Sequence, residues 1–199
     1  MEEARPPAPL LVVISGKPAT GKTTLGLRLA TDLGLPLFSK DGVKETLFDA
    51  MGVGDRAWSR RLGGASMATL RYITETLLAA GQSLIIEANF TLKWDAPFYQ
   101  SVAARHGARV AQVWLTAEPE VILRRFERRA ASGVRHPGHV ELANLDEFRA
   151  ALRADDAPLP LGGALCVVDT TDIVAMEYNT ILHQLRMVTD GAAQPGQPS

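Results

Sequence analysis

The chain has 199 residues, of which 46% are hydrophobic and 22% charged, and its formal net charge is −1. This composition is typical of a globular domain and gives no basic excess for binding nucleic acid or an anionic membrane. The single cysteine, Cys166, excludes an intrachain disulfide, and we expect it to be a buried structural thiol. No apolar run approaches the ~18 residues of a membrane span. We therefore expect a cytoplasmic protein, monomeric or homodimeric, without nucleic-acid or membrane partners.

Apolar strand-like runs alternate with helical patterns along the chain. The predicted strands are 10–15, 35–39, 83–88, 108–116 and 164–170, and the predicted helices are 22–33, 43–48, 59–80, 96–105, 118–131 and 173–188. Strands that alternate with helices imply βαβ crossovers and a mainly parallel sheet covered on both faces. We predict one α/β domain over 10–189, with disordered ends at 1–9 and 190–199.

The stretch "GKPATGKT", residues 16–23, fits the pattern G-x-x-x-x-G-K-[ST] at every fixed position. A buried strand precedes it and a helical pattern follows, which is the context of a phosphate-binding loop. Its glycines permit turns that a β-carbon would obstruct, and its N–H groups and the helix N-terminus form an anion site. We expect Lys22 to reach the β- and γ-phosphates of ATP and the Thr23 hydroxyl to bind Mg²⁺. The other predicted nucleotide contacts in the loop are Gly16, Lys17, Ala19, Thr20, Gly21 and Thr24.

Two carboxylates follow predicted strands, at the edge where open α/β sheets bind ligands. Asp41 comes after the second strand and can accept the proton of an attacking hydroxyl, or it can act as the N-cap of the next helix. Glu87 ends the third strand, where an acid can hold Mg²⁺. Its alternative role is a salt bridge to an arginine of the lid predicted below. Asn89, two residues later, projects into the same crevice.

Five arginines lie in and just after the helix predicted at 118–131, namely Arg124, Arg125, Arg128, Arg129 and Arg135. The long connection that follows, about 130–163, predicts a lid. Arg125 and Arg129 share one helix face at i, i+4. We expect this pair and Arg135 to bind phosphate oxygens, and the alternative is a solvated basic face.

Five stretches in this order resemble small bacterial P-loop kinases of the zeta-toxin and chloramphenicol-phosphotransferase type: "SGKPATGKTT", "SKDGVKETLFD", "IIEANF", "RRFERRAASGVRHPGH" and "VVDTTD". Polynucleotide, gluconate and shikimate kinases are broader relatives. The resemblance implies a three-layer P-loop NTPase fold of nucleotide-kinase type, with a five-stranded parallel sheet of order 2-3-1-4-5 and an arginine-bearing lid. It also implies that Asp41 is the catalytic base and that Thr170 and Thr171 lie near adenine. Glu87 stands where relatives often carry aspartate.

We expect an ATP- and Mg²⁺-dependent kinase that phosphorylates a hydroxyl of a small molecule, such as an antibiotic or another natural product. The predicted catalytic residues are Asp41, Lys22, Arg125 and Arg129. The predicted acceptor contacts are Asp41, Lys44, Trp58, Arg61, Asn89, Phe90 and Trp94. Lys44 is equally typical of a solvated helix face, and the aromatic residues are also typical of a core. The alternatives are a nucleotide, nucleotide-sugar or polynucleotide kinase, and a nucleotide-binding regulator without catalytic activity.

Overall fold

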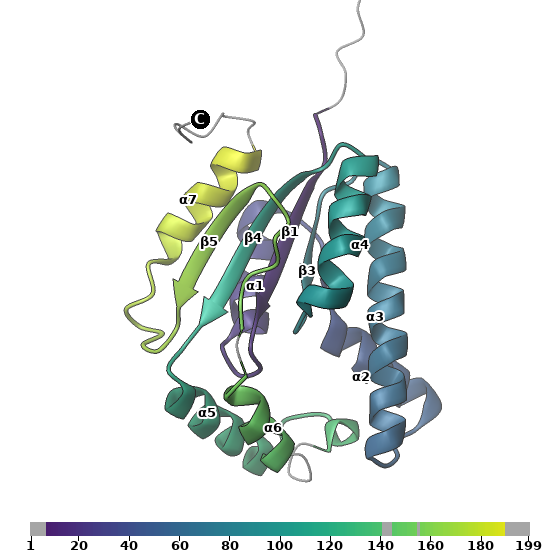
Figure 1. Ribbon diagram of the computed structural model, residues 1–199, viewed down its shortest axis with the longest axis vertical. Helices are drawn as coiled ribbons and strands as arrows, with labels where there is room; N and C mark the ends of the chain where they lie inside the picture. Colours follow the sequence, from purple (N-terminus) through teal and green to yellow (C-terminus); the bar gives the residue numbers. More distant parts are fainter. Residues whose placement is uncertain (1–6, 141–144, 155, 190–199) are drawn as a thin grey trace, which may run out of the picture.

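The computed structural model describes residues 7–140, 145–154 and 156–189. A parallel five-stranded sheet lies between two layers of helices (Figure 1). The strands are β1 (Leu10–Gly16), β2 (Leu37–Ser39), β3 (Leu84–Glu87), β4 (Arg109–Thr116) and β5 (Ala164–Asp169). Their order is β2-β3-β1-β4-β5, and every neighbouring pair is parallel. The fold class and the strand order expected from the resemblance are therefore confirmed.

Helices cover both faces of this sheet. They are α1 (Lys22–Leu33), α2 (Lys40–Met51), α3 (Arg56–Ala79), α4 (Leu92–Arg105), α5 (Pro119–Ser132), α6 (Leu145–Leu152) and α7 (Tyr178–Thr189), with a short 3₁₀ helix η1 (Pro137–His139). Helices α1 and α7 lie on one face and α3 and α4 on the other, while α5 and α6 lie beyond the carboxyl ends of the strands (Figure 1). In the described part of the chain, no helix is long and apolar enough to cross a membrane.

The central strand β1 is buried along its whole length and holds the phosphate loop in place. Side chains alternate between the two faces of a strand. Accordingly, Leu10, Val12 and Ile14 pack in the apolar cluster under α1 and α7. Leu11 and Val13 pack in the cluster under α3 and α4. A strand fixed on both faces gives the loop at its carboxyl end a rigid base.

Helix α2 begins at Lys40, three residues before its predicted start. The Ser39 side chain is its N-cap and accepts a hydrogen bond from the Gly42 N–H at 2.9 Å. Asp41 therefore lies in the first turn, and the interpretation of Asp41 as the N-cap is wrong. Helix α4 also begins early, at Leu92, because the Asp95 carboxylate accepts the Thr91 N–H at 2.7 Å. A capping side chain can thus extend a helix beyond its apolar pattern.

Strand β5 departs from the predicted burial on both faces. It is an edge strand of the sheet, and its Leu165 and Val167 are 50% and 58% exposed. Cys166 is half-buried rather than fully buried, and burial raises the pKa of its thiol. The apolar run therefore predicted this strand but not the exposure of the face that carries Leu165 and Val167. Apart from residues 7–9, the chain ends that we expect to be disordered lie outside the described residues.

Candidate active site

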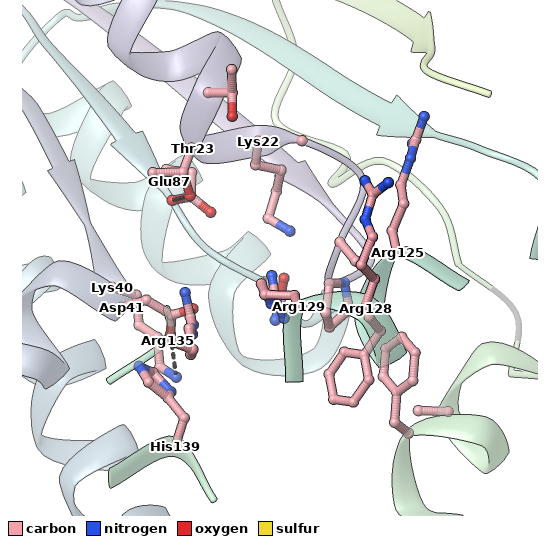
Figure 2. Close-up of a pocket in the computed structure, with 18 of the residues that line it drawn as sticks. Lys22, Thr23, Lys40, Asp41, Glu87, Arg125, Arg128, Arg129, Arg135 and His139 are labelled. Carbon is pink, nitrogen blue, oxygen red and sulfur yellow. Dashed lines mark hydrogen bonds and ion pairs between the residues drawn. The ribbon is translucent and has the colours of Figure 1, made fainter. Parts of the chain in front are cut away.

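A cavity of about 820 Å³ opens at the carboxyl ends of the strands. Figure 2 shows side chains from the phosphate loop, α2 and α5 facing one another across it. Its lining includes Lys22, Thr23, Thr24, Lys40, Asp41, Lys44, Arg56, Glu87, Asn89, Arg125, Arg128, Arg129, Arg135, His139 and Glu147. The segments after β1, β2, β3 and β4 all contribute side chains, because parallel strands end at the same edge of a sheet. We call the part near Lys22 the donor end and the part near Asp41 the acceptor end.

Three residues of the phosphate loop have positive φ angles: Gly16 (131°), Ala19 (64°) and Gly21 (95°). A β-carbon at Gly16 would lie 2.2 Å from the carbonyl oxygen of Leu115, so only glycine fits there. Turns of this kind direct successive N–H groups into an anion-binding concavity. Helix α1 begins at Lys22 and adds its positive N-terminal dipole. The loop fits the phosphates of a nucleotide.

Lys22 is only 6% exposed and lines the cavity. Its Nζ donates to the Lys17 carbonyl at 2.8 Å. Burial lowers the pKa of Lys22 to about 8, although the nearby Glu87 carboxylate opposes this effect. A buried ammonium held by the loop is suited to interact with phosphate oxygens.

The Thr23 hydroxyl donates to Glu87 Oε2 at 3.0 Å, inside the cavity. Burial raises the pKa of Glu87, although Lys22 opposes that shift. A hydroxyl and a carboxylate are hard oxygen ligands, which Mg²⁺ uses together with phosphate oxygens and water. The residues present therefore fit a Mg²⁺ ion, and the assignment of Thr23 and Glu87 as its ligands stays a prediction.

Three arginines of α5, Arg125, Arg128 and Arg129, line the cavity. Sequence spacing selected only Arg125 and Arg129, because it assumed that one helix face alone reaches the site. Arg128 lines the cavity as well, so more than one face of α5 contributes to it. Arg125 Nη2 donates to the carbonyl oxygens of Thr170 at 2.6 Å and Thr171 at 3.2 Å.

Two predicted nucleotide contacts after β5 lie beside the cavity rather than on its lining. Thr170 is buried, and its hydroxyl donates to the Thr20 carbonyl of the phosphate loop at 2.8 Å. The Thr171 hydroxyl accepts the Glu118 N–H at 2.9 Å. Ile173 is the residue of this segment that lines the cavity. The expected adenine contact of Thr170 and Thr171 stays a prediction.

Lys17 turns away from the cavity, although it belongs to the phosphate loop. Its Nζ donates to the carbonyl oxygens of Leu152 and Ala154, both at 2.8 Å. These carbonyls lie at the C-terminal end of α6, where backbone acceptors have no partner within the helix. Lys17 therefore joins the phosphate loop to α6.

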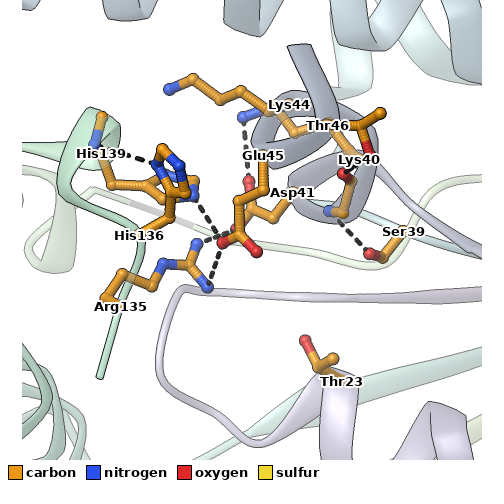
Figure 3. A network of polar contacts seen from close by, with 12 residues as sticks. Thr23, Ser39, Lys40, Asp41, Lys44, Glu45, Thr46, Arg135, His136 and His139 are labelled. Atoms are coloured by element: carbon orange, nitrogen blue, oxygen red, sulfur yellow. Dashed lines mark hydrogen bonds and ion pairs between the residues drawn. The ribbon is translucent and has the colours of Figure 1, made fainter. Parts of the chain in front are cut away.

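At the acceptor end, Asp41 is held by two cations (Figure 3). Lys40 Nζ donates to Asp41 Oδ1 at 3.2 Å, and Arg135 donates to Asp41 Oδ2. Burial opposes ionisation of Asp41, but the charges of Lys40 and Arg135 outweigh it and hold the pKa of this carboxyl below its usual range. Arg135, which we expected on phosphate oxygens, pairs with the candidate base in this structure.

The segment around η1 is docked on α2 by ring stacking and a hydrogen bond. The His136 ring stacks on Phe48 at 5.1 Å with an interplanar angle of 4°. His139 Nε2 lies 2.8 Å from Glu45 Oε1. Burial, together with the charge of Arg135, lowers the pKa of His139 to about 3, so its ring is neutral at pH 7.

Helix α6 closes the remaining side of the cavity. Phe148 stacks on Phe126 of α5, with ring centroids 3.8 Å apart. Glu147 pairs with Arg56 of α3 at 2.9 Å and with Arg60 at 3.1 Å. The described parts of the predicted lid region thus contact α2, α3 and α5, whereas residues 141–144 and 155 of that region lie outside the described residues. The closing motion of a lid stays a prediction.

Four predicted acceptor contacts are absent from the cavity lining: Trp58, Arg61, Phe90 and Trp94. Trp58 instead donates through Nε1 to the Gly52 carbonyl at 2.9 Å. Phe90 packs edge-on against Tyr99 under α4. Arg61 is exposed, and Trp94 is 63% exposed. Trp58 and Arg61 were predicted because the helix at 59–80 was expected to wall the acceptor, and Phe90 and Trp94 because they are close to Asn89 in sequence. Neither argument indicates which side of a helix faces the site.

Besides Arg128, four titratable residues of the lining were not predicted as site residues: Lys40, Arg56, His139 and Glu147. Lys40 is next to Asp41, so its position was a usable signal. The other three come from α3, η1 and α6, and no local pattern in the sequence connects them. Only their contacts across the cavity identify them.

The sheet order, the phosphate loop and the lined cavity together define a nucleotide-binding P-loop protein of the kinase type. A family model described as "AAA domain" matches residues 11–154. The chain belongs to this family.

Individual relatives agree with that class. A candidate kinase from Chloroflexus aurantiacus J-10-fl is 42% identical, with a TM-score of 0.83 over 91% of this chain and 98% of that one. A shikimate kinase from Synechococcus sp. (strain JA-3-3Ab) is 28% identical over 157 residues, which are 76% of this chain and 72% of the relative. Kti12 from Chaetomium thermophilum, solved in complex with ADP-AlF₃, is 17% identical with a TM-score of 0.63 over 92% of this chain and all of that one, and it shows the shared fold. The narrower zeta-toxin and chloramphenicol-phosphotransferase resemblance stays a prediction.

Proposed function

We propose that this protein is an ATP- and Mg²⁺-dependent phosphotransferase whose acceptor is a hydroxyl group of a small molecule. One observation carries the proposal. A single cavity of about 820 Å³ is lined both by Lys22 and Thr23 of the phosphate loop and by the carboxylate of Asp41. A kinase needs these two sets of groups on opposite sides of the reacting atoms.

Bound MgATP would supply the γ-phosphoryl group. Phosphoryl transfer leaves little covalent chemistry for the protein, so its residues act by positioning and by charge. Lys22 and the three cavity arginines of α5 neutralise phosphate oxygens. Thr23 and Glu87 are the residues that would hold Mg²⁺.

Asp41 is the group that orients the acceptor hydroxyl and takes its proton. Lys40 and Arg135 keep this carboxylate ionised, so it can accept a hydrogen bond from the hydroxyl at neutral pH. Each carboxylate oxygen has more than one lone pair. The hydroxyl can therefore bind without first displacing either cation.

The acceptor is a small molecule in this proposal because the cavity must also hold the phosphates of the nucleotide. Pockets that hold a drug-sized ligand measure about 300–1,000 Å³, so a cavity of about 820 Å³ that also takes nucleotide phosphates leaves room for a small acceptor. Hydroxylated antibiotics, other natural products and sugar-like metabolites are the compounds to supply. A nucleotide, a nucleotide sugar and a polynucleotide end belong in the same panel as alternatives.

The test is to supply ATP, Mg²⁺ and this panel and to detect products that gain one phosphate by mass spectrometry. We expect Asp41→Asn to keep nucleotide affinity and to lose transfer by about 10²–10⁴-fold, the usual contribution of a general base. Asp49→Asn is the matched control, because Asp49 lies on the same helix outside the cavity lining, is 75% exposed, and its replacement by asparagine keeps an oxygen for the contact with His136 Nε2 at 3.2 Å.

Transfer that survives Asp41→Asn nearly intact would overturn the proposed mechanism. Phosphorylation of nucleotides or polynucleotide ends alone would replace the acceptor class. Nucleotide binding with no phosphorylated product from any member of the panel would favour a nucleotide-binding regulator.

A further inference from the structure

Lys44 is a buried cation in the wall of the acceptor end. It is 5% exposed and lines the cavity. Its Nζ donates to the Ser59 hydroxyl at 2.8 Å. An ammonium has three donors, and among the described residues Ser59 is the one hydrogen-bond acceptor of this group. No carboxylate of the described ranges lies within ion-pair distance of Lys44 Nζ.

The groups packed around Lys44 add positive charge. Lys40 precedes it by one helical turn, and like charges at i, i+4 repel. A β-carbon at Gly63 of α3 would lie 3.8 Å from Lys40 Nζ and 3.9 Å from Lys44 Cε, so the two lysines lie side by side against a glycine. The pKa of Lys44 is lowered to about 8, mainly by burial and also by the charges of Lys40, Arg56 and Arg135, while Asp41 opposes this shift.

Charge along the described lining is unbalanced. It contains eight lysines and arginines, Lys22, Lys40, Lys44, Arg56, Arg125, Arg128, Arg129 and Arg135, against three carboxylates, Asp41, Glu87 and Glu147. In the proposed function, Lys22 and the arginines of α5 neutralise the phosphates of the nucleotide. At the acceptor end, Lys40 and Arg135 share Asp41, and Arg56 pairs with Glu147. Lys44 is the cation left without an anionic partner in these described contacts.

A buried ammonium without an anion is costly to the fold. A lysine that served only to pack α2 against α3 would be better replaced by an apolar side chain of similar length. The phenyl ring of Phe48, 5.2 Å from Nζ, offers only a weak cation–π contact. The arrangement therefore fits a charge kept for a ligand.

We propose that Lys44, supported by Lys40 and Arg56, binds an anionic group of the acceptor, so that the substrate is a hydroxylated acid or a phosphorylated hydroxyl compound. This inference rests on the proposed function, because it assumes that the cavity binds a hydroxylated acceptor. The shared chemistry of the ligand is a negatively charged oxygen cluster, which is either a carboxylate or a phosphate. Neutral hydroxyl compounds are disfavoured, because they would leave Lys44 unneutralised.

The test compares the parental protein with Lys44→Met and with the control Lys93→Met, whose lysine lies on the Trp94 ring outside the cavity lining. A non-hydrolysable ATP analogue and Mg²⁺ first fill the donor end. Malonate and inorganic phosphate are then the carboxylate and phosphate probes, with sodium chloride at equal ionic strength as the reference. The measured quantity is the rise in Tm that each probe causes.

We expect at least one probe to raise the Tm of the parental protein and of Lys93→Met above the chloride reference. We expect Lys44→Met to lose more than half of that rise. The probe with the larger effect identifies the class of anion. Equal rises in Lys44→Met and the parental protein would overturn the proposal, and so would the absence of any rise in the parental protein.

A second readout separates a ligand role from a structural role. The pKa of Lys44 is about 8 in the folded state, against 10.5 for an ordinary lysine. At pH 7 the charged ammonium is therefore less stable in the folded chain than in the unfolded chain, and it lowers the free energy of unfolding. Without any anion, Lys44→Met should therefore have a higher Tm than the parental protein at pH 7. A lower Tm would indicate a structural role and contradict the inference.

A third measurement needs no variant. An amine-reactive reagent should label Lys44 in the analogue-loaded parental protein, and the effective probe should slow this labelling relative to Lys93, as read by peptide mass spectrometry. Unchanged labelling of Lys44 would overturn the inference.

These measurements require nucleotide binding but no turnover. A protein that binds the probes through Lys44 and yet transfers no phosphate would refute the proposed function and leave the anion site standing. Transfer to a neutral acceptor at a rate independent of Lys44 would refute the anion site alone.

Discussion

The donor and acceptor ends of the cavity are built in different ways. The donor end is built around one continuous stretch, 16–24, whose backbone conformation forms an anion-binding concavity, and Glu87 and the arginines of α5 lie beside it. The acceptor end joins side chains of α2 to side chains that follow 94 residues later, as in the Asp41–Arg135 and Glu45–His139 contacts. A site formed by backbone conformation tolerates few substitutions, because each one can disturb the whole loop. A site formed by side chains can change its ligand contacts by substitution of one residue at a time.

This difference accounts for the pattern of relatives. The chain belongs to the family of the "AAA domain" model and is 28% identical over 157 residues to a shikimate kinase. A common donor end and a variable acceptor end are what such a family requires. In the proposed function, the identity of the acceptor depends on Asp41, Lys44 and the residues docked over them.

The largest effect should come from Gly16→Ala, which places a β-carbon 2.2 Å from the Leu115 carbonyl oxygen at a φ angle of 131°. We expect the free energy of unfolding to fall by about 4 kcal/mol or more, because backbone atoms cannot move aside. Nucleotide affinity should fall with it. Urea unfolding and nucleotide titration measure the two quantities. Gly64→Ala, in the interior of α3 with open space around it, should instead add about 0.5–1 kcal/mol.

An intermediate effect should come from the equivalent change at the acceptor end, Gly138→Ala. A β-carbon there would lie 2.5 Å from the Phe48 ring, and such overpacking costs about 1–3 kcal/mol. We expect η1 to move off α2, so that Arg135 loses its position on Asp41. Phosphate transfer should fall while nucleotide affinity stays near the parental value. An equal loss of both would show that the two ends are not separable.

A smaller effect should come from Glu87→Gln, which removes the charge of a predicted Mg²⁺ ligand and keeps its shape. We expect Mg²⁺ affinity in the presence of nucleotide to fall about tenfold or more, as for other groups that support a metal. Because the pKa of Glu87 is raised by burial, acidification should protonate it and weaken Mg²⁺ binding in the parental protein. The variant should lack this pH dependence. An identical pH dependence in both proteins, by calorimetric titration, would remove Glu87 from the Mg²⁺ site.

Much of this protein follows from short-range patterns in its sequence. The apolar runs predicted all five strands, and "GKPATGKT" predicted the loop that follows β1. These features are readable because each depends on residues that are neighbours in the chain. Asp41 and Glu87 could be placed at the cavity for the same reason, since parallel strands end at one edge.

The tertiary structure decided the rest. It determined that Arg128 lines the cavity together with Arg125 and Arg129, that Trp58 and Trp94 do not, and that Lys44 is buried without an anion in its described surroundings. Spacing along a helix shows which side chains share a face, but not which face meets another element. That choice depends on how α2, α3, α5 and η1 pack over the sheet, and therefore on contacts between residues far apart in the chain.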